Sequence, residues 1–449
     1  MPAARQAERI VRVAQVIDEL APAGGIEEAL VTLIQALSAY DVQSVVLTFQ
    51  APAAANPYAR RLRSIGASVH TPPAWLARTR LRGSAIARSA AVLLLLLFFP
   101  LTLPCLAALA MRRGNGLQRN WQSLVGRLQR QLSVEVLLRR MWQRYLRAWL
   151  QRHAVDCVHV HGYGCGVVPQ WGLDVARAGL PVIYTEHGLP WPELRQRPDL
   201  RAAMADCRHR IAVSRASADA MRAYCGAGDP LHVVHHVVPD LARLGPAPSR
   251  PGLTGPTFGC VAMLRPDKGH LYWLRSMPAV LRHWPDARFV LAGDGVERTT
   301  LEAEAARLGI VPHVLFLGCV DHDGLGQLLS QWDVFVLPSL NEPLGIAVVE
   351  AMAAGLPIVA TRAGGVVDLV CDEHTALLVP PCDSERLAAA QLRLAGDLEL
   401  RVRLGRAARQ AYEEGPFTAG QVGGAIAQIY STALGGRAGQ QSSAAHPQR

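Results

Sequence analysis

The sequence of 449 residues contains a single lysine, Lys268, whereas its other 45 basic side chains are arginines. A lysine is a compact ammonium on a flexible stem, and an arginine is a wide planar fork. The two therefore do not replace each other freely in a narrow anion site. Lys268 lies in the run Arg265-Pro266-Asp267-Lys268-Gly269. This observation alone leaves two interpretations open: a surface lysine present by chance, or a lysine kept for an anion site.

The chain also lacks paired cysteines and an amino-terminal apolar stretch. Its nine cysteines are scattered, and none forms a Cys-x-x-Cys pair or clusters with histidine at the spacing of zinc ligands. This pattern argues against a disulfide scaffold and indicates reduced, mostly buried thiols in a cytosolic protein. Residues Met1 to Arg9 lack the apolar stretch of a secretory signal. Half of the residues are hydrophobic, which excludes global disorder.

Acidic residues are almost absent from Tyr58–Leu150. This window holds sixteen arginines and one acid, Glu135, and so carries +15 in a chain whose net charge is +10. A basic window of this kind attracts anions such as lipid head groups, nucleic acid or a phosphorylated substrate.

The same window contains Ser89–Met111, 23 residues without a charge. That length would cross a bilayer, which needs about 20 residues. Three interpretations compete: a spanning helix, a re-entrant or interfacial hairpin, and a buried helix pair in a soluble protein. A spanning helix would separate strands of one sheet. Arginines flank both ends, and they mark the cytoplasmic side of a membrane segment. Pro100 and Pro104 would bend it. We therefore favour a membrane dip with both ends cytoplasmic.

The stretch Trp121–Leu150 continues as a helix rich in arginine, leucine and tryptophan, with Trp142, Tyr145 and Trp149 among its aromatic residues. This mixture suits a lipid head-group interface, and we expect a membrane surface to contact about residues 78–150. An ordinary amphipathic helix with a solvated basic face is the alternative.

Apolar strands alternate with amphipathic stretches in two separate halves, which predicts parallel sheets covered on both faces. The first half includes a helix at Ile26–Tyr40, and its strands are expected at Ile10–Ile17, Ser44–Phe49, Ala67–His70, Cys157–Val160, Pro181–Tyr184, Ile211–Val213 and His232–Val234. The second half is expected to hold strands at Phe258–Leu264, Arg288–Ala292, Val314–Leu317, Val334–Leu337, Pro357–Ala360 and Ala376–Val379. Helical patterns follow at Glu385–Ala395, Leu398–Glu413 and Thr418–Thr432.

Two basic residues after a strand of the second half suit a nucleotide sugar. Such a donor carries a diphosphate, and further negative charge develops on it when its sugar–phosphate bond breaks. Arg265 and Lys268 follow the strand at the edge where α/β sheets bind ligands. Arg265 can offer a bidentate fork to one phosphate, and Lys268 can offer a point charge to the other phosphate.

Two glutamates about two helical turns apart complete this candidate site. Pro343-Leu344-Gly345 opens a helix expected at Ile346–Ala354, whose free N–H groups can bind anions and hydroxyl oxygens. Glu342 lies before this turn, and its carboxylate can accept hydrogen bonds from sugar hydroxyls. Glu350 can accept from two vicinal ribose hydroxyls. An unrelated helix with two solvated glutamates is the alternative.

The segment Leu337–Gly365 resembles the signature of family 4 retaining glycosyltransferases. It holds Glu342-Pro-Leu-Gly345, then Glu350-Ala-Met-Ala-Ala-Gly-Leu-Pro-Ile-Val-Ala-Thr361, then Gly364-Gly365. The resemblance covers most of the chain outside Trp75–Leu150. It implies an α/β protein of the GT-B fold, in which two Rossmann-like domains with parallel sheets face a central cleft.

The resemblance also implies roles for individual residues. It assigns donor binding to Gly24, Gly25, Arg265, Lys268, Glu342, Leu344, Gly345 and Glu350, and catalysis to His187, Glu342, Arg265 and Lys268. A plain strand–helix turn would also explain the two glycines, and His187 can instead be structural. His159 and His161 are weaker candidates on the acceptor side, with a structural role as the alternative.

Two departures from the family pattern stand out. The run His235-His236-Val237-Val238-Pro239-Asp240 replaces the common Pro-Asn-Gly-Val-Asp, which puts donor or acceptor contacts from that loop in doubt. Asp368 stands near a position where the family commonly has Glu.

The domain organisation follows. We expect an N-terminal Rossmann-like acceptor domain over 1–240 with an insert at about 75–150, a linker at 241–256, and a C-terminal Rossmann-like donor domain over 257–415. A C-terminal helix at 416–434 can pack back on the first domain, and residues 435–449 are expected to be disordered.

The resemblance implies a retaining sugar transfer from a UDP- or GDP-sugar. The sequence shows no cluster of aspartates or histidines that suits a metal, and we expect no metal, cofactor or nucleic acid partner. The insert suggests a lipid-linked or saccharide acceptor, at the inner face of a bacterial membrane, in envelope or exopolysaccharide synthesis. Two alternatives stay open: a sugar-nucleotide epimerase of the same fold, and an inactive adaptor that binds membrane or nucleic acid.

Overall fold

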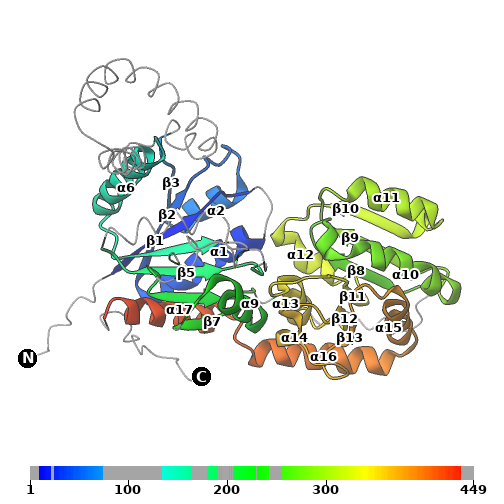
Figure 1. Ribbon diagram of the computed structural model, residues 1–449. Helices are drawn as coiled ribbons and strands as arrows, with labels where there is room; N and C mark the ends of the chain where they lie inside the picture. The colour runs from blue at the N-terminus through cyan, green and yellow to red at the C-terminus, as the bar shows by residue number, and fades with distance from the viewer. Residues whose placement is uncertain are drawn as a thin grey trace, which may run out of the picture.

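The computed structural model describes residues 10–21, 25–73, 134–162, 179–190, 192, 194, 202, 204, 206–228, 230–239, 241 and 255–435. These residues form two α/β units, each built on a parallel sheet (Figure 1). The predicted fold class is confirmed. The apolar run 89–111, Gly24 and the predicted disordered tail beyond Gly435 lie outside the described residues.

The N-terminal sheet has seven strands, and every neighbouring pair is parallel. Their order is β3 (Ser68–His70), β2 (Val42–Thr48), β1 (Val11–Ile17), β4 (Cys157–Gly162), β5 (Val182–Glu186), β6 (His209–Ala212) and β7 (Leu231–Val233). Strand residues alternate between two apolar layers. One layer joins the sheet to α1 (Gly25–Leu37), α2 (Pro57–Ser64) and α17 (Ala419–Ala433), and the other joins it to α6 (Val134–Arg152) and α9 (Arg215–Ala220).

The C-terminal sheet has six parallel strands. Their order is β10 (Val314–Gly318), β9 (Arg288–Ala292), β8 (Thr257–Val261), β11 (Val334–Leu337), β12 (Ile358–Thr361) and β13 (Leu377–Val379). One face packs on α10 (His270–His283), α11 (Arg298–Arg307) and α15 (Ser384–Gly396). The other packs on α12 (His322–Leu329), α13 (Ile346–Ala353), α14 (Val366–Leu369) and α16 (Leu398–Glu414).

The last helix returns to the first domain. The chain passes along α16 beneath the C-terminal unit and then along α17 beneath the N-terminal sheet, drawn in orange and red (Figure 1). Thr418 and Gln421 form a reciprocal capping box that fixes the start of α17. Ile426 and Tyr430 are buried against Val13 and Ile183 of the first sheet. Residues far apart in the sequence thus share one core.

Helix α6 corrects one expectation about the membrane. Trp142 is completely buried and Trp149 is 6% exposed, and both pack in the apolar layer on the sheet. Arg140, Arg144 and Arg147 are exposed. These tryptophans therefore do not face a lipid head group, and the outer face of α6 is formed by arginines. Within the described ranges, we find no helix whose length and hydropathy would let it cross a bilayer.

Both sheets reverse their strand order at one point, between β1 and β4 in the first and between β8 and β11 in the second. Ligands of open α/β sheets bind outside the carboxyl ends of the strands at such a point. The loops after β8 and β11 carry Lys268 and Glu342, so the topology brings the two predicted site segments together.

Candidate active site

The single lysine is ion-paired with one of the predicted glutamates. Lys268 Nζ lies 2.7 Å from Glu342 Oε2, and the two side chains are only 15% and 9% exposed. The Ser339 hydroxyl donates to the same carboxylate oxygen over 3.0 Å. A cation from the loop after β8 and a carboxylate from the loop after β11 therefore meet at the switch point of the sheet.

Backbone contacts hold these two loops against each other. The N–H groups of Leu340 and Asn341 donate to the Asp267 carbonyl over 2.8 and 3.3 Å. Gly269 has φ +67°, and a β-carbon there would lie 2.1 Å from the Pro338 carbonyl oxygen. Only glycine satisfies both conditions, so the Lys-Gly pair is required by this close approach.

Arg265 has a different partner from Lys268. Its Nε and Nη2 donate to the two carboxylate oxygens of Asp267 over 2.9 and 2.6 Å. Burial by itself would raise the pKa of Asp267, but the hydrogen bonds and charge of Arg265 bring it below its usual range. The carboxylate thus occupies the bidentate fork that a phosphate would use, and a bound diphosphate would have to displace it.

The start of α13 offers backbone donors beside this ion pair. Gly345 precedes the helix with φ +97° and packs against the Glu342 side chain. The N–H groups of Leu344 and Gly345 form no hydrogen bond with any residue in the described part of the chain. Such free N–H groups at a helix start bind anions or hydroxyl oxygens.

Glu350 is the fifth residue of α13, about one helical turn from its start, and is 6% exposed. Burial raises its pKa to about 8, and the negative charge of Glu28 on α1 adds to the effect. Glu28 is itself ion-paired with Arg61. A β-carbon on Gly25, at the start of α1, would lie 3.4 Å from Ile346 Cδ1. The first helix of the N-terminal domain therefore faces the predicted ribose-binding helix.

Other contacts join the two domains near Glu342. The Asp368 carboxylate accepts from the backbone N–H of Arg215, over 2.6 Å, at the start of α9. A β-carbon on Gly364 would lie 3.0 Å from Leu189 Cδ1 of the N-terminal domain. The aspartate that departs from the family pattern thus makes an interdomain hydrogen bond.

The predicted histidines lie in a buried polar network of the first domain. Both ring nitrogens of His187 are hydrogen bonded, Nε2 to His161 Nδ1 over 2.9 Å and Nδ1 to His236 Nε2 over 2.8 Å. His161 Nε2 lies 2.8 Å from Gln15 Oε1. Burial lowers the pKa of His161 and His187 well below the usual value and that of His236 to about 3.

His159 is completely buried, and its two ring nitrogens bond to Tyr430 and Thr185 over 2.7 and 2.6 Å. It has no nitrogen left for an acceptor sugar in this arrangement. Sequence reasoning did not identify Gln15, Tyr430 or His236 as parts of this network. The one signal for Gln15 was its position between the apolar residues Ala14 and Val16 of the strand.

Two family models match the chain in sequence. The model described as "Glycosyltransferase Family 4" matches residues 106–240, and the model described as "Glycosyl transferases group 1" matches residues 247–411. The two matches follow the two α/β units. The chain belongs to family 4 of the glycosyltransferases. The first match begins inside the stretch Trp75–Leu150, so the expectation that the resemblance is absent there is wrong for its second part.

Individual relatives agree with this membership. An uncharacterised glycosyltransferase of Methanocaldococcus jannaschii is 40% identical over 28% of this chain and 33% of its own length. The α-D-kanosaminyltransferase of Streptomyces kanamyceticus is 29% identical over 59% of this chain and 74% of its own. The phosphatidyl-myo-inositol mannosyltransferase of Mycobacterium leprae is 28% identical over 64% of this chain and 76% of its own length.

Solved structures show the same GT-B fold. A glycosyltransferase from Rickettsia africae has a TM-score of 0.67 at 16% identity, and the match covers 95% of this chain and 99% of that one. HepE of Anabaena, solved in complex with UDP and glucose, has a TM-score of 0.65 at 20% identity, over 94% and 100% of the two chains.

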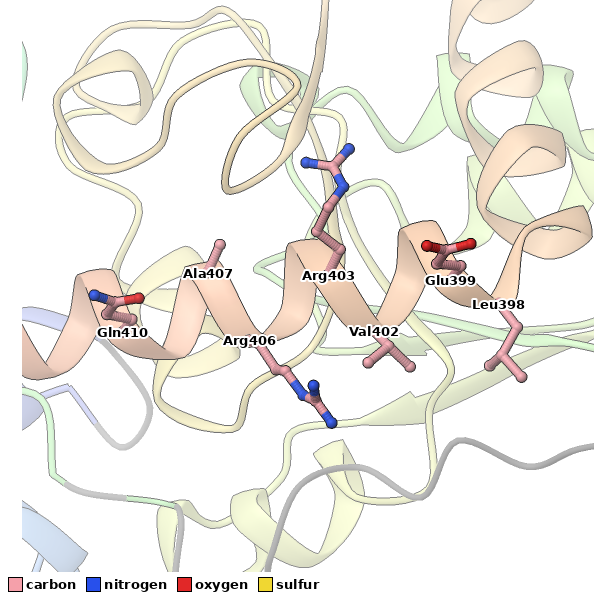
Figure 2. Close-up of a pocket in the computed structure, with 7 residues that line it drawn as sticks. All are labelled: Leu398, Glu399, Val402, Arg403, Arg406, Ala407 and Gln410. Carbon is pink, nitrogen blue, oxygen red and sulfur yellow. The ribbon is translucent and has the colours of Figure 1, made fainter.

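The surface of this family 4 chain has two hollows that are not lined by the candidate donor-binding residues. One, of about 750 Å³, runs along α16 (Figure 2). Its lining residues all belong to that helix: Leu398, Glu399, Val402, Arg403, Arg406, Ala407 and Gln410. The other, of about 270 Å³, lies between the segments that follow β1 and β2, from Glu19 to Leu20 and from Gln50 to Pro57. Neither is lined by Lys268, Glu342 or Glu350.

Proposed function

We propose that this chain is a retaining, metal-independent glycosyltransferase that moves a sugar from a UDP- or GDP-sugar to a lipid-linked or saccharide acceptor. The ion pair between Lys268 and Glu342, beside the free N–H groups at the start of α13, is the observation that carries the proposal. It combines a cation for a phosphate, a carboxylate for sugar hydroxyls and backbone donors within one loop pair. HepE of Anabaena, whose fold this chain shares, has been solved with UDP and glucose.

Lys268 and the backbone N–H groups would stabilise the departing nucleotide diphosphate. The bond between the sugar's anomeric carbon and the phosphate oxygen breaks, and a bond from that carbon to the acceptor oxygen forms on the same face. The departing phosphate takes the acceptor's hydroxyl proton. Negative charge grows on the phosphate during this step, so preorganised donors at its position lower the barrier.

Arg265 and Glu350 would complete the donor site. Arg265 has to leave Asp267 to reach a phosphate, and the bidentate geometry of its present contact is the one that a phosphate also uses. Glu350 would accept from two ribose hydroxyls. Its raised pKa means that the carboxyl group is largely protonated at neutral pH until a ligand or a domain movement changes its surroundings.

The basic outer face of α6 supports the proposed lipid acceptor and the proposed location at a membrane. Arg140, Arg144 and Arg147 are exposed on one helix. A row of arginines attracts anionic lipid head groups. A relative that acts on phosphatidyl-myo-inositol supports a lipid acceptor. We therefore place the enzyme at the cytoplasmic face of a bacterial membrane, in envelope or exopolysaccharide synthesis.

A donor panel tests the proposal. UDP-glucose, UDP-galactose, UDP-N-acetylglucosamine and GDP-mannose are compared by thermal shift, because a ligand of the folded state raises stability by mass action. The best donor is then incubated with a bacterial membrane extract, with and without EDTA, and the anomeric configuration of the product is determined by NMR. Stabilisation by none of the four donors would overturn the donor assignment. Conversion of the nucleotide sugar without any acceptor would identify an epimerase instead.

A further inference from the structure

Three histidines of the first domain form one hydrogen-bonded chain. It starts at Gln15 Oε1 and continues through the rings of His161, His187 and His236, with donor–acceptor distances of 2.8, 2.9 and 2.8 Å. The rings of His187 and His236 are stacked, with their centroids 5.0 Å apart. At the far end, His236 Nδ1 is buried and has no hydrogen-bond partner among the described residues.

The direction of this chain follows from its first member. The Gln15 amide nitrogen donates to Ser44 Oγ over 3.3 Å and to Tyr430 OH over 3.2 Å, so the amide oxygen faces His161. A neutral imidazole has one N–H and one lone pair. Each ring therefore donates from Nε2 and accepts at Nδ1. The last lone pair, on His236, stays open, and the opposite direction would leave a buried N–H without a partner, which is rarer in folded proteins.

The open end lies on the ligand-binding side of the sheet. Gln15 is inside β1, His161 is next to last in β4, His187 directly follows β5, and His236 comes three residues after β7. The strands are parallel, so these positions lead toward their carboxyl ends. Open α/β sheets bind ligands there. His236 belongs to the loop whose sequence departs from the family pattern.

We propose that His236 Nδ1 accepts a hydrogen bond from a hydroxyl group of the bound carbohydrate, and that His187 holds the His236 ring in the orientation that this contact requires. This inference rests on the proposed function. Both ring nitrogens of His187 are already occupied, whereas His236 leaves one lone pair unmatched in the interior. His236 is 8% exposed, so the side chains that cover it move aside when the carbohydrate enters. A matching hydroxyl then removes the cost of a buried, unpaired acceptor.

Three variants separate the two nitrogen atoms of His236. His236→Gln keeps a donor at the position of Nε2, toward His187, and removes the acceptor at Nδ1. His236→Asn keeps an oxygen near Nδ1 and loses the contact with His187. His236→Phe keeps the ring and removes both. His235→Gln is the matched control, because His235 is the neighbouring residue and its Nδ1 is already bonded to the Val213 carbonyl over 2.7 Å.

The first measurement uses the free full-length chain. Nitrogen NMR of the ¹⁵N-histidine-labelled protein is expected to show protonated Nε2 and unprotonated Nδ1 for His161, His187 and His236. His236→Phe should shift the His187 signals, while His235→Gln should not. Protonated Nδ1 on His236 would overturn the proposal.

The second measurement uses whichever of UDP-glucose, UDP-galactose, UDP-N-acetylglucosamine and GDP-mannose stabilises the wild-type chain most. His236→Gln and His236→Phe are expected to lower kcat/KM of sugar transfer about 10- to 100-fold, the loss of one buried hydrogen bond. His236→Asn should be affected less, and His235→Gln should stay within about twofold of wild type.

Deoxy analogues identify the hydroxyl group. A donor or acceptor analogue that lacks the contacted hydroxyl should be a poor substrate for wild type but no poorer than the parent compound for His236→Phe. The inference is overturned if every analogue lowers kcat/KM by the same factor in the wild type and in His236→Phe. If no nucleotide sugar stabilises even the wild type, the proposed function fails instead, and the variants are not needed to show it.

Discussion

Lys268 and Glu342 are 74 residues apart in sequence, and their side chains form a 2.7 Å ion pair in a partly closed environment. The pair stabilises the loops after β8 and β11 in their present arrangement. Removal of either partner would leave a buried charge without its counterpart, which costs more than the intact pair contributes. The same two groups are the proposed contacts to the donor, so binding exchanges one partner of the lysine for another.

Replacement of Lys268 is expected to abolish most donor affinity. Lys268→Ala removes a buried charged donor, which corresponds to about 2–4 kcal/mol, or about a 30- to 1000-fold weaker affinity. Lys268→Arg should recover only part of it, because the fork is wider than the ammonium. Arg275→Ala is the control, since Arg275 pairs with Glu304 on the surface of the same domain. Isothermal titration calorimetry with the best donor measures the affinity of each variant. Equal affinity of Lys268→Ala and wild type would contradict the proposed donor-binding site.

A comparison of alanine substitutions at Gly269 and Gly309 separates the effect of a close neighbouring atom from the effect of the backbone conformation. Their φ angles are +67° and +69°, but a β-carbon would meet the Pro338 carbonyl oxygen at 2.1 Å only in the first case. Gly309→Ala is expected to cost about 1 kcal/mol of unfolding free energy, and Gly269→Ala about 2–4 kcal/mol. Urea denaturation measures both. Equal losses would show that the loops after β8 and β11 do not touch as described.

Glu350 makes the stability of the free chain depend on pH. Its pKa is raised from 4.5 to about 8 in the folded state, chiefly by burial and then by Glu28. The folded form therefore holds a proton that the unfolded form releases above pH 4.5. Its contribution is complete below pH 4.5 and is lost as pH rises through 8.

Compared with Glu350→Gln, wild type should accordingly lose about 2–4 kcal/mol of unfolding free energy between pH 5 and pH 9. Urea denaturation of both proteins at several pH values gives this difference, in which other titrating groups cancel. Glu385→Gln, on an exposed position, should show no such trend. A constant gap between wild type and Glu350→Gln would mean that Glu350 is ionised in the folded chain.

Tyr430 and Tyr40 test how α17 holds the first domain. The Tyr430 hydroxyl is buried and bonds to His159 and Gln15 over 2.7 and 3.2 Å, whereas the Tyr40 hydroxyl donates to the Gly420 carbonyl at the surface. Tyr430→Phe leaves the buried His159 Nδ1 without a partner and removes one of the two acceptors of the Gln15 amide nitrogen, which should cost about 1–3 kcal/mol. Tyr40→Phe should cost less than about 1 kcal/mol. Thermal denaturation of the two variants measures these losses. A larger loss for Tyr40→Phe than for Tyr430→Phe would contradict the buried network.

The strand pattern could be predicted because each strand of a parallel sheet is a short apolar run bounded by turns. The expected strand at Val334–Leu337 has the same bounds in the structure, while the one at Phe258–Leu264 ends earlier, at Val261. There the chain turns so that Lys268 can reach the loop after β11. The segment after Val261 thus contacts the loop after β11, which lies far away in sequence.

The aromatic residues of α6 show where sequence reasoning failed. Trp142 and Trp149 between arginines suit a membrane interface as well as a sheet, because both environments accept an apolar ring. Only the position of the helix on the sheet decides which environment they meet. In the structure the rings are in the core and the arginines are outside.

Local residue order was enough for the α/β alternation, the two halves and the segments that carry Lys268, Glu342 and Glu350, because these depend on periodicity and on glycine positions within a few residues. The tertiary structure alone decided that Lys268 pairs with Glu342, and that Gln15, Tyr430 and four histidines share one network. Such pairings join residues from separate strands and helices, and their distances exist only after the sheets have closed around them.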